Sequence, residues 1–257
     1  MDLQLNGKVA LVAGSSRGIG RAIAAALLRE GCRVCITGRD DASLHLAGEE
    51  MAKSFGEEYI LKLSGDLTDS KIIAGALGSV VKVCGSLDIL IANVGSGSGK
   101  LGWDQSDAEW ERLFNMNFFG SVRLAQTAIP HMQKRGGSIV FISSIVGVEA
   151  TPAPLPYSAA KSALINYCKN LARAVAEYKI RVNCIAPGNI FFHGGSWERN
   201  LENRRESVMQ YIASEVPLNR FGTPEEVADM TIFLASPVSG FVTGGCFIVD
   251  GGQTRTI

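Results

Sequence analysis

The chain has 257 residues, of which 46% are hydrophobic and 19% charged, and its formal net charge is zero. This length fits one large α/β domain or two small ones and buries most of the core-forming surface. Because neither a basic excess nor a Lys/Arg run occurs, we expect no nucleic-acid partner and no anionic membrane partner. The first residues lack the basic and apolar regions of a signal peptide, and no run of eighteen apolar residues occurs, so we expect a cytoplasmic location.

Short apolar runs typical of strands alternate along the chain with runs at helical spacing. In chain order, strands are predicted at 8–13, 33–37, 59–63, 87–92, 138–143, 180–185 and 246–249, and helices at 21–29, 42–55, 69–84, 107–134, 157–177 and 223–234. Repeated β-α alternation with near-continuous apolar strands predicts a parallel sheet covered on both faces. We therefore expect an α/β fold with about seven parallel strands and helices on both faces.

Six cysteines lie mostly in apolar runs, and we expect them to be reduced core residues. They are Cys32, Cys35, Cys84, Cys168, Cys184 and Cys246. The first two form a C-x-x-C, but residues three apart on a strand face opposite ways, so a redox or metal role is not expected there. The three histidines, His45, His131 and His193, have no ligand-like spacing, so no catalytic metal site is predicted.

A glycine-rich turn lies directly between the first predicted strand and the first predicted helix. It reads Gly14-Ser-Ser-Arg-Gly18-Ile-Gly20. Backbone N–H groups at the start of such a helix bind phosphate, and the glycines let the ligand come close. The spacing Gly-x-x-x-Gly-x-Gly differs from the more common Gly-x-Gly-x-x-Gly, but its place between a strand and a helix predicts a dinucleotide site.

A second motif follows the strand predicted at 138–143. Ser144 comes first, and three prolines within 152–156 are expected to keep the chain extended up to Tyr157. The helix that follows puts Tyr157 and Lys161 on one face. A nearby ammonium lowers the pKa of a phenol from about 10, which makes general acid-base catalysis feasible. The alternative is an ordinary half-buried tyrosine beside a solvated lysine.

In this order, the motifs resemble those of the short-chain dehydrogenase/reductase family, in particular the bacterial 3-oxoacyl-[acyl-carrier-protein] reductases and their carbonyl-reductase relatives. The resemblance covers essentially the whole chain. The matching segments are Gly14-x-x-x-Gly18-Ile-Gly20, Asp66-Leu67-Thr68, Ala92-Asn93-Val94-Gly95, Asn117, Ser144, Tyr157-x-x-x-Lys161, Pro187-Gly188 and Val249-Asp-Gly-Gly-Gln253. The chain departs from the family pattern at Ala13, where threonine is usual, and at Val94.

The resemblance implies a single-domain doubly wound Rossmann fold, with residues 1–257 forming one NAD(P)-binding catalytic domain. It also implies four catalytic residues. Tyr157 would protonate the substrate carbonyl oxygen, and Ser144 would hydrogen-bond the same oxygen. Lys161 would lower the pKa of the phenol and hold the nicotinamide ribose, while Asn117 would anchor a water that relays protons. The alternatives are that Ser144 caps a turn and that Asn117 bonds backbone groups.

Two cations favour NADP(H), with NAD(H) as the alternative cofactor. Gly38 is followed by Arg39 where NAD-preferring relatives place an acid, and Arg17 supplies a second guanidinium for a 2′-phosphate. The carboxylates of Asp40 and Asp41 weaken the positive potential of the two arginines, and Arg39 could instead be a solvated loop charge. The residues implied to bind cofactor are Gly14, Ser16, Arg17, Gly18, Ile19, Gly20, Arg39, Asp66, Leu67, Asn93, Gly95, Tyr157, Lys161, Pro187, Gly188 and Ile190.

A substrate lid is predicted at about 188–220, because paired glycines and several aromatics follow Pro187. Its apolar side chains either line a pocket for an apolar substrate or pack the lid against the rest of the domain. They are Ile190, Phe191, Phe192 and Trp197. The loop 95–103 borders the same cleft. The resemblance implies NADPH-dependent reduction of a carbonyl, most of all a 3-oxoacyl thioester. The alternatives are dehydrogenation of a free ketone, polyol or sugar alcohol, and a dinucleotide sensor or scaffold.

An acidic acyl carrier protein would need a basic docking surface. The acyl-carrier reductases carry an arginine before the strand that leads to Ser144 and another before the next strand. Arg135 matches the first position, whereas Tyr178 occupies the second, with Lys179 and Arg173 nearby. The resemblance also implies a homotetramer, assembled through the helices at 107–134 and 157–177 and the last strand.

Overall fold

Seven parallel strands form one sheet through the middle of the molecule, in the order β3-β2-β1-β4-β5-β6-β7. The computed structural model describes residues 1–256. The strands are β1 (Val9–Val12), β2 (Arg33–Gly38), β3 (Ile60–Ser64), β4 (Ile89–Ala92), β5 (Gly137–Ile142), β6 (Ile180–Pro187) and β7 (Cys246–Val249). All seven predicted strands are present within two residues of their expected limits, so the predicted parallel α/β fold is confirmed.

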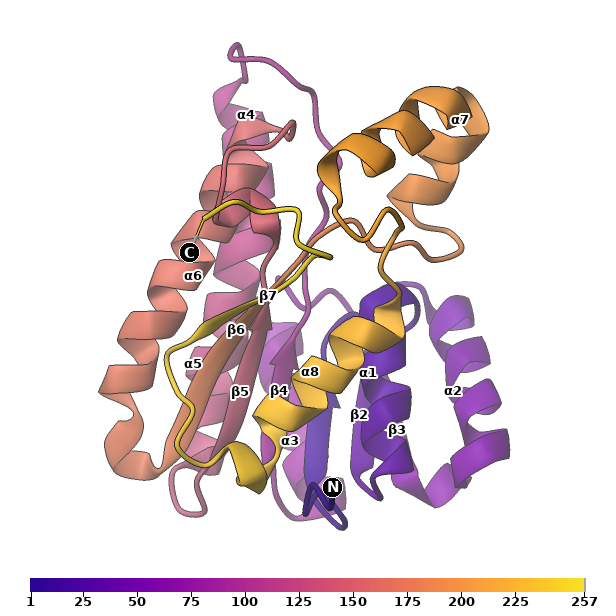
Figure 1. Ribbon diagram of the computed structural model, residues 1–257. Coiled ribbons are helices and arrows are strands. Elements are labelled where there is room, and N and C mark those ends of the chain that lie inside the picture. Colours follow the sequence, from indigo (N-terminus) through magenta and orange to yellow (C-terminus); the bar gives the residue numbers. More distant parts are fainter. Residues whose placement is uncertain (257) are drawn as a thin grey trace.

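Helices cover both faces of the sheet (Figure 1). They are α1 (Gly18–Arg29), α2 (Asp41–Phe55), α3 (Ser70–Cys84), α4 (Asp107–Phe114), α5 (Gly120–Met132), α6 (Leu155–Ala174), α7 (Ser196–Glu215) and α8 (Pro224–Ala235). One core layer joins the sheet to α3, α5 and α6, and the other joins it to α1, α2 and α8. Helix α7 stands beyond the end of the sheet (Figure 1).

Strand β1 explains why the strands read as continuous apolar runs. All four of its residues are buried. Leu11 belongs to the core layer of α3, α5 and α6, whereas Ala10 and Val12 belong to the layer of α1, α2 and α8. Because successive side chains on a strand point to opposite faces, a sheet covered on both faces needs apolar residues at every position.

The order of the strands also determines where a ligand binds. From β1 the chain first adds β2 and β3 on one side and then β4 to β7 on the other. The connections after β1 and β4 therefore leave in opposite directions and open a crevice at the carboxyl ends of these strands. The glycine turn follows β1, and Asn93 follows β4, so both lie at this crevice.

Three helical expectations differ from the structure. Helix α6 begins at Leu155 rather than at the expected Tyr157, because Pro156 lies in the first turn, where a missing N–H costs no hydrogen bond. The predicted helix at 107–134 is divided into α4 and α5 by a π-helical turn, Asn115–Phe119. The predicted lid contains the 20-residue helix α7, whose backbone kinks at Arg204.

Among residues 1–256, none of the helices combines the length and the apolar character needed to cross a lipid bilayer.

Candidate active site

The glycine turn after β1 is packed too tightly for larger residues. Gly14 has a φ of 62°, and a Cβ there would lie 2.7 Å from the carbonyl oxygen of Asn93. A Cβ on Gly20 would lie 2.2 Å from the carbonyl oxygen of Gly14. Only glycine combines a left-handed backbone with this close approach. The spacing of these glycines is therefore set by contact between the turn, the first turn of α1 and the end of β4.

Hydrogen bonds to the end of β2 hold the turn in place. The Gly14 amide donates to Oγ1 of Thr37 at 3.1 Å, and the Ser15 amide donates to the carbonyl oxygen of Thr37 at 2.8 Å. Sequence analysis did not select Thr37 for the site. The sequence signal that could have identified Thr37 is a hydroxyl side chain near the carboxyl end of a buried strand.

The start of α1 suits an anion. Its N-cap residue, Arg17, provides no side-chain cap, and its first turn contains no acidic residue. The first backbone N–H groups of the helix have no intrahelical partner, so they are available to phosphate oxygens. Arg17 and Arg39 are both exposed, and Ser16 lies against Gly38 at the end of β2. The two predicted phosphate-binding cations therefore stand on neighbouring loops.

Asn93 connects β4 to the glycine turn. Its side-chain amide donates to the carbonyl oxygens of Ala13 at 3.2 Å and Gly14 at 3.1 Å. Asp66 instead orders its own turn, accepting from the amide of Thr68 at 3.0 Å and from its hydroxyl at 2.9 Å. Leu67 is only 6% exposed and packs in the core, so mainly its backbone is available to a ligand.

Ser144 and Tyr157 meet at the carboxyl end of β5. The Ser144 hydroxyl lies near enough to the phenol of Tyr157 to lower its pKa in part. It also accepts from the amide of Val146 at 3.4 Å, so the turn-capping alternative for Ser144 is observed. A Cβ on Gly147 would lie 2.6 Å from the carbonyl carbon of Lys161. The turn after Ser144 thus packs directly on α6, and sequence analysis did not identify Gly147 as the residue that permits this.

Lys161 is only 4% exposed, so it is not a solvated charge. Its ammonium donates to the carbonyl oxygen of Ile142 at 2.9 Å and lies 5.9 Å from the ring centre of Tyr157. The hydroxyl of Ser143 donates to the carbonyl oxygen of Lys161 at 2.9 Å. Burial lowers the pKa of Lys161 from 10.5 to about 8, because an ammonium loses hydration in the interior.

The expected lowering of the pKa of Tyr157 by Lys161 is wrong for this structure. Burial raises the pKa of Tyr157, and only the hydrogen bond to Ser144 lowers it in part. The Lys161 ammonium is 5.9 Å from the ring centre and is bonded to a backbone carbonyl. The loss of hydration of the phenolate therefore exceeds the attraction of the cation, and Tyr157 remains a protonated acid at neutral pH.

Asn117 lies fully buried in the π-helical turn, a distortion often found at functional sites. Its Oδ1 accepts from the amide of Ser96 at 3.0 Å, and its Nδ2 donates to the carbonyl oxygens of Ser96 at 3.1 Å and Leu113 at 3.0 Å. The backbone-bonding alternative is therefore observed. A Cβ on Gly95 would lie 2.5 Å from Oδ1 of Asn117 and 3.1 Å from Nζ of Lys161, so glycine is what lets these groups approach.

Two loops border the paired hydroxyls. A Cβ on Gly97 would lie 3.3 Å from the Tyr157 ring, so the loop 95–103 passes beside the phenol as predicted. In the lid, the Trp197 ring stacks on Tyr211 at 6.0 Å and contacts Phe221 at 5.3 Å. These contacts support packing of the lid aromatics on one another. Phe192 is different, because its ring lies 2.8 Å from the position of a Cβ on Gly18.

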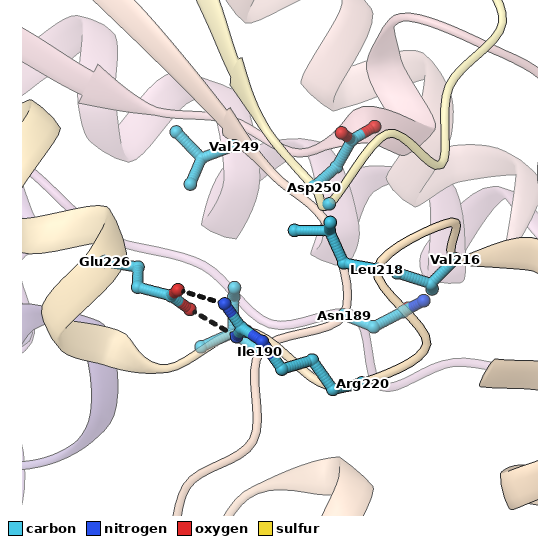
Figure 2. A pocket seen from close by; sticks show the side chains of 10 residues that line it. Asn189, Ile190, Val216, Leu218, Arg220, Glu226, Val249 and Asp250 are labelled. Atoms are coloured by element: carbon cyan, nitrogen blue, oxygen red, sulfur yellow. Dashed lines mark hydrogen bonds and ion pairs between the residues drawn. The ribbon is translucent and has the colours of Figure 1, made fainter. Parts of the chain in front are cut away.

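The residues after β6 line a separate pocket. Gly188 donates its amide to the carbonyl oxygen of Val249 at 2.9 Å, beside the end of β7. The side chain of Ile190 is 6% exposed and faces a cavity of about 160 Å³ (Figure 2). That cavity is lined by Asn189, Ile190, Val216, Leu218, Arg220, Gly222, Glu226, Val249, Asp250 and Gly251. Ile190 thus packs the start of the lid against α8.

Within residues 1–256, no three His, Cys, Asp or Glu side chains are placed together to hold a metal ion. The six cysteines are all free thiols.

Comparison with known proteins agrees with this geometry. A family model described as enoyl-(acyl carrier protein) reductase matches residues 13–254. The chain is 36% identical over 258 residues to a 3-oxoacyl-[acyl-carrier-protein] reductase from Aquifex aeolicus, covering 98% of this chain and 100% of that protein. Its structure resembles L-sorbose reductase from Gluconobacter frateurii in complex with NADPH and L-sorbose, with a TM-score of 0.93, 32% identity and full coverage of both chains.

A third similar structure is a 7α-hydroxysteroid dehydrogenase in complex with NADH, with a TM-score of 0.90 and 27% identity, covering 99% of this chain and 97% of that one. The fold and the site define a Rossmann-type oxidoreductase that uses a nicotinamide cofactor. The chain belongs to the short-chain dehydrogenase/reductase family.

Glu226 generates a prediction about the edge of the pocket in Figure 2. Its carboxylate pairs with both Nη atoms of Arg220, at 2.9 and 2.6 Å, and accepts from the amide of Thr223 at 2.9 Å. The bond to Arg220 is the largest cause that lowers the pKa of Glu226 from 4.5 to about 2. The stability gained from this lowered pKa is present above about pH 4.5 and is lost as the pH falls toward 2.

The substitution Glu226→Gln keeps a residue suited to the capping box but removes the charge. At pH 7 we expect it to lower the free energy of unfolding by about 1 kcal/mol at most, because the pair is largely exposed. The difference from the original protein should disappear between pH 4.5 and 2, as followed by urea unfolding at a series of pH values. A difference that does not depend on pH would contradict the ion-pair explanation.

Proposed function

We propose that this protein is an NADPH-dependent reductase that converts a carbonyl to an alcohol, with 3-oxoacyl thioesters as the leading substrate class. One observation carries the proposal. The Ser144 hydroxyl is near enough to the phenol of Tyr157 to lower its pKa, and the Lys161 ammonium lies 5.9 Å from the centre of the phenol ring. Through Asn93 and Gly95, the end of β4 contacts both this group and the glycine turn.

The residues of the crevice fit a nicotinamide dinucleotide. The cradle at Gly14 and Gly20 and the uncapped start of α1 suit the pyrophosphate. Arg17 and Arg39 would hold a 2′-phosphate. The remaining residues proposed for the adenine and nicotinamide halves are Ser16, Gly18, Ile19, Asp66, Leu67, Asn93, Gly95, Tyr157, Lys161, Pro187, Gly188 and Ile190. When bound, the reduced dinucleotide supplies hydride to the carbonyl carbon.

The residues of the chain supply the proton and hold the oxygen. Tyr157, whose pKa is raised by burial, carries its proton at neutral pH and donates it to the carbonyl oxygen. Ser144 donates a hydrogen bond to the same oxygen, which stabilises the developing charge by roughly 2 to 4 kcal/mol. Lys161, with a pKa of about 8, is mainly cationic at pH 7 and holds its charge beside the phenol ring, where it would bind the nicotinamide ribose. Asn117 would anchor the water that returns a proton.

Removing the phenol hydroxyl tests this assignment. In Tyr157→Phe we expect kcat to fall by about 10²- to 10⁴-fold, because the general acid is lost. The dissociation constant for NADPH should change little. Tyr167→Phe is the matched control, since Tyr167 lies on the same helix but packs against Phe118 and Phe141. NADPH absorbance gives the rate and NADPH fluorescence the affinity. Unchanged turnover in Tyr157→Phe would refute the mechanism.

Arg39 generates a prediction about the cofactor. In Arg39→Ser we expect NADPH to bind about tenfold more weakly, because a charge-assisted hydrogen bond is worth roughly 1.5 to 3 kcal/mol. NADH lacks the 2′-phosphate, so its affinity should not change. Arg29→Ser, at the other end of α1, is the control. Titration of each variant with both dinucleotides would show the difference. Equal losses for NADPH and NADH would mean that Arg39 does not select the phosphate.

The choice of substrate draws on two similarities. The 36% identity to a 3-oxoacyl-[acyl-carrier-protein] reductase over the full length favours a 3-oxoacyl thioester. The 32% identity and TM-score of 0.93 to L-sorbose reductase favour a second candidate, a free ketone, polyol or sugar alcohol. The paired hydroxyls would serve either substrate, because both present a carbonyl oxygen to the same donors. The loop 95–103 and the lid at 188–220 are the segments that would distinguish them.

The position of Arg135 bears on whether an acyl carrier protein docks. Arg135 is exposed and its Nε lies 3.7 Å from Asp88. Arg135 precedes β5, whereas Ser144 follows this strand. The two residues are therefore separated by the length of a six-residue strand, about 20 Å. Tyr178, at the second docking position, is half-buried against the core. A carrier bound at this end of the sheet would therefore lie far from Ser144 of the same chain.

A comparison of acyl carriers tests the substrate proposal. We expect acetoacetyl-pantetheine to be reduced with NADPH. If a carrier docks at Arg135, Arg135→Glu should lower kcat/KM for the carrier-bound acyl group by about tenfold, or 1.4 kcal/mol, without affecting the pantetheine thioester. Arg29→Glu is the charge-reversal control.

Equal effects of Arg135→Glu on both thioesters would exclude docking at Arg135. Reduction of a free ketose but of neither thioester would favour the second candidate. Binding of NADPH without its oxidation by any carbonyl in a broad panel would favour a dinucleotide sensor or scaffold.

We further propose that the protein is a cytoplasmic homotetramer. Phe119 at the α4–α5 junction is 44% exposed, and Phe241 before β7 is fully exposed. Both lie on the helices or next to the strand that the family uses for assembly. Contact with further copies of the chain would remove these aromatic surfaces from water.

A further inference from the structure

A tight turn after β7 brings the end of the chain onto the lid. Gly251 and Gly252 have φ values of 69° and 86°, and the carboxylate of Asp250 accepts from the amide of Gly252 at 2.9 Å. The amide of Leu218, near the end of the lid, donates to the carbonyl oxygen of Gly251 at 3.2 Å. Residues 253–256, called the tail below, follow directly after this turn.

The first side chain of the tail, Gln253, is only 7% exposed and bridges two parts of the lid. Its Oε1 accepts from Nδ2 of Asn189 at 2.7 Å, and its Nε2 donates to the hydroxyl of Tyr211 at 2.9 Å. A primary amide offers both a donor and an acceptor, so one side chain can satisfy both partners. Asn189 lies at the start of the lid and Tyr211 on α7, so the bridge fixes two points of the lid that are distant in sequence.

The ring of Tyr211 extends the effect of this bridge to both halves of α7. The helix kinks at Arg204, with Tyr211 after the kink and Trp197 before it. The two rings are stacked, with their centres 6.0 Å apart and their planes at 18°. A group that holds the phenol of Tyr211 therefore also limits the movement of Trp197.

The far end of the tail is attached to the loop between the two catalytic hydroxyls. Glu149 lies in this loop, after Ser144 and before Tyr157. Its Oε2 accepts from the backbone amides of Arg255 at 2.7 Å and Thr256 at 3.1 Å. The tail is thus bonded to the lid at one end and to the catalytic loop at the other.

A cavity of about 300 Å³ lies between these three segments. Residues 149–152 of the catalytic loop line it, together with Tyr211 and Gln253. Because the lid and the loop form different walls, the width of the cavity depends on how the lid is held relative to the loop. The bridge at Gln253 is the contact that connects the tail to the lid wall at Tyr211.

We propose that Gln253 is a positioning residue for the carbonyl substrate, because its bridge between Asn189 and Tyr211 holds the lid at a fixed place beside the catalytic loop. The inference rests on the proposed reductase function and assigns this cavity to the part of the substrate beyond the carbonyl. Gln253 acts through Tyr211 rather than on the reacting atoms. Without the bridge the lid occupies its ordered position for less of the time, and the apparent affinity for substrate falls in proportion.

Substrate kinetics give the first test. Gln253→Met removes both hydrogen bonds but keeps an unbranched side chain of similar size. At saturating NADPH we expect KM for acetoacetyl-pantetheine, or for a free ketose if that is the substrate, to rise about tenfold. The value of kcat should stay within about twofold, since bound substrate orders the lid and the catalytic hydroxyls are unchanged.

Tyr211→Phe is the second variant, because it removes one hydroxyl and keeps the ring that stacks on Trp197. It should also raise KM. The double variant should have the KM of Gln253→Met alone, because the two side chains belong to one bridge. Additive effects of the two substitutions would contradict a single bridge.

Cleavage by trypsin gives a readout that needs no turnover. The lid exposes Arg199, Arg204 and Arg205. Cleavage of a folded protein follows the population in which the cleaved segment is open. Without substrate, we expect Gln253→Met to be cut in the lid about tenfold faster than the original protein, as followed by mass spectrometry of the fragments. Gln210→Met is the matched control, because Gln210 is an exposed glutamine on the same helix, and it should alter neither cleavage nor KM.

The two readouts separate this inference from the proposed function. If the original protein reduces no carbonyl, the proposed function fails, while cleavage of Gln253→Met still decides whether this residue holds the lid. Three results would overturn the inference. They are lid cleavage at the original rate, faster lid cleavage with an unchanged KM, and an equal increase in cleavage at Arg29 in α1, which would indicate a general loss of stability.

Discussion

A buried ammonium bonded to a strand carbonyl is the interaction on which the rest of the site depends. Lys161 is 4% exposed and donates to the carbonyl oxygen of Ile142, the last residue of β5. Holding a cation in the interior is costly, and the lowered pKa of Lys161 reflects that cost. The contact also fixes α6 relative to β5, and Ser143 strengthens it by donating to the carbonyl of Lys161. Ser144 and Tyr157, which flank this contact in the chain, are thereby brought together.

The residues after β4 contact both the glycine turn and the catalytic side chains. Asn93 bonds the glycine turn, while two residues later Gly95 allows Asn117 and Lys161 to approach. The cofactor cradle and the paired hydroxyls are thus attached to the same three-residue segment. In a doubly wound sheet these groups can share one segment because β4 adjoins both β1 and β5.

The lid and the edge strand β7 lie outside this crevice. The lid is stiffened by its own aromatics, with Trp197 between Tyr211 and Phe221. At the edge of the sheet, the four-residue strand β7 carries the exposed Cys246, which pairs in register with the buried Cys184 of β6. A rigid parallel sheet with adaptable loops at one end is a common basis for different substrates on one fold.

The sequence by itself determined the parallel α/β fold, the glycine turn and the membership in the family, because each depends on local periodicity or on short ordered motifs. It also placed Ser144, Tyr157 and Lys161 in one region, since two of them are four residues apart on a helix. The tertiary structure decided the properties that depend on distant neighbours. The pKa of Tyr157 is raised because burial outweighs the cation, Asn117 sits in a π-helical turn, and Cys184 meets Cys246 across two strands. Hydration loss and strand register arise only when separate segments pack, so no local pattern reports them.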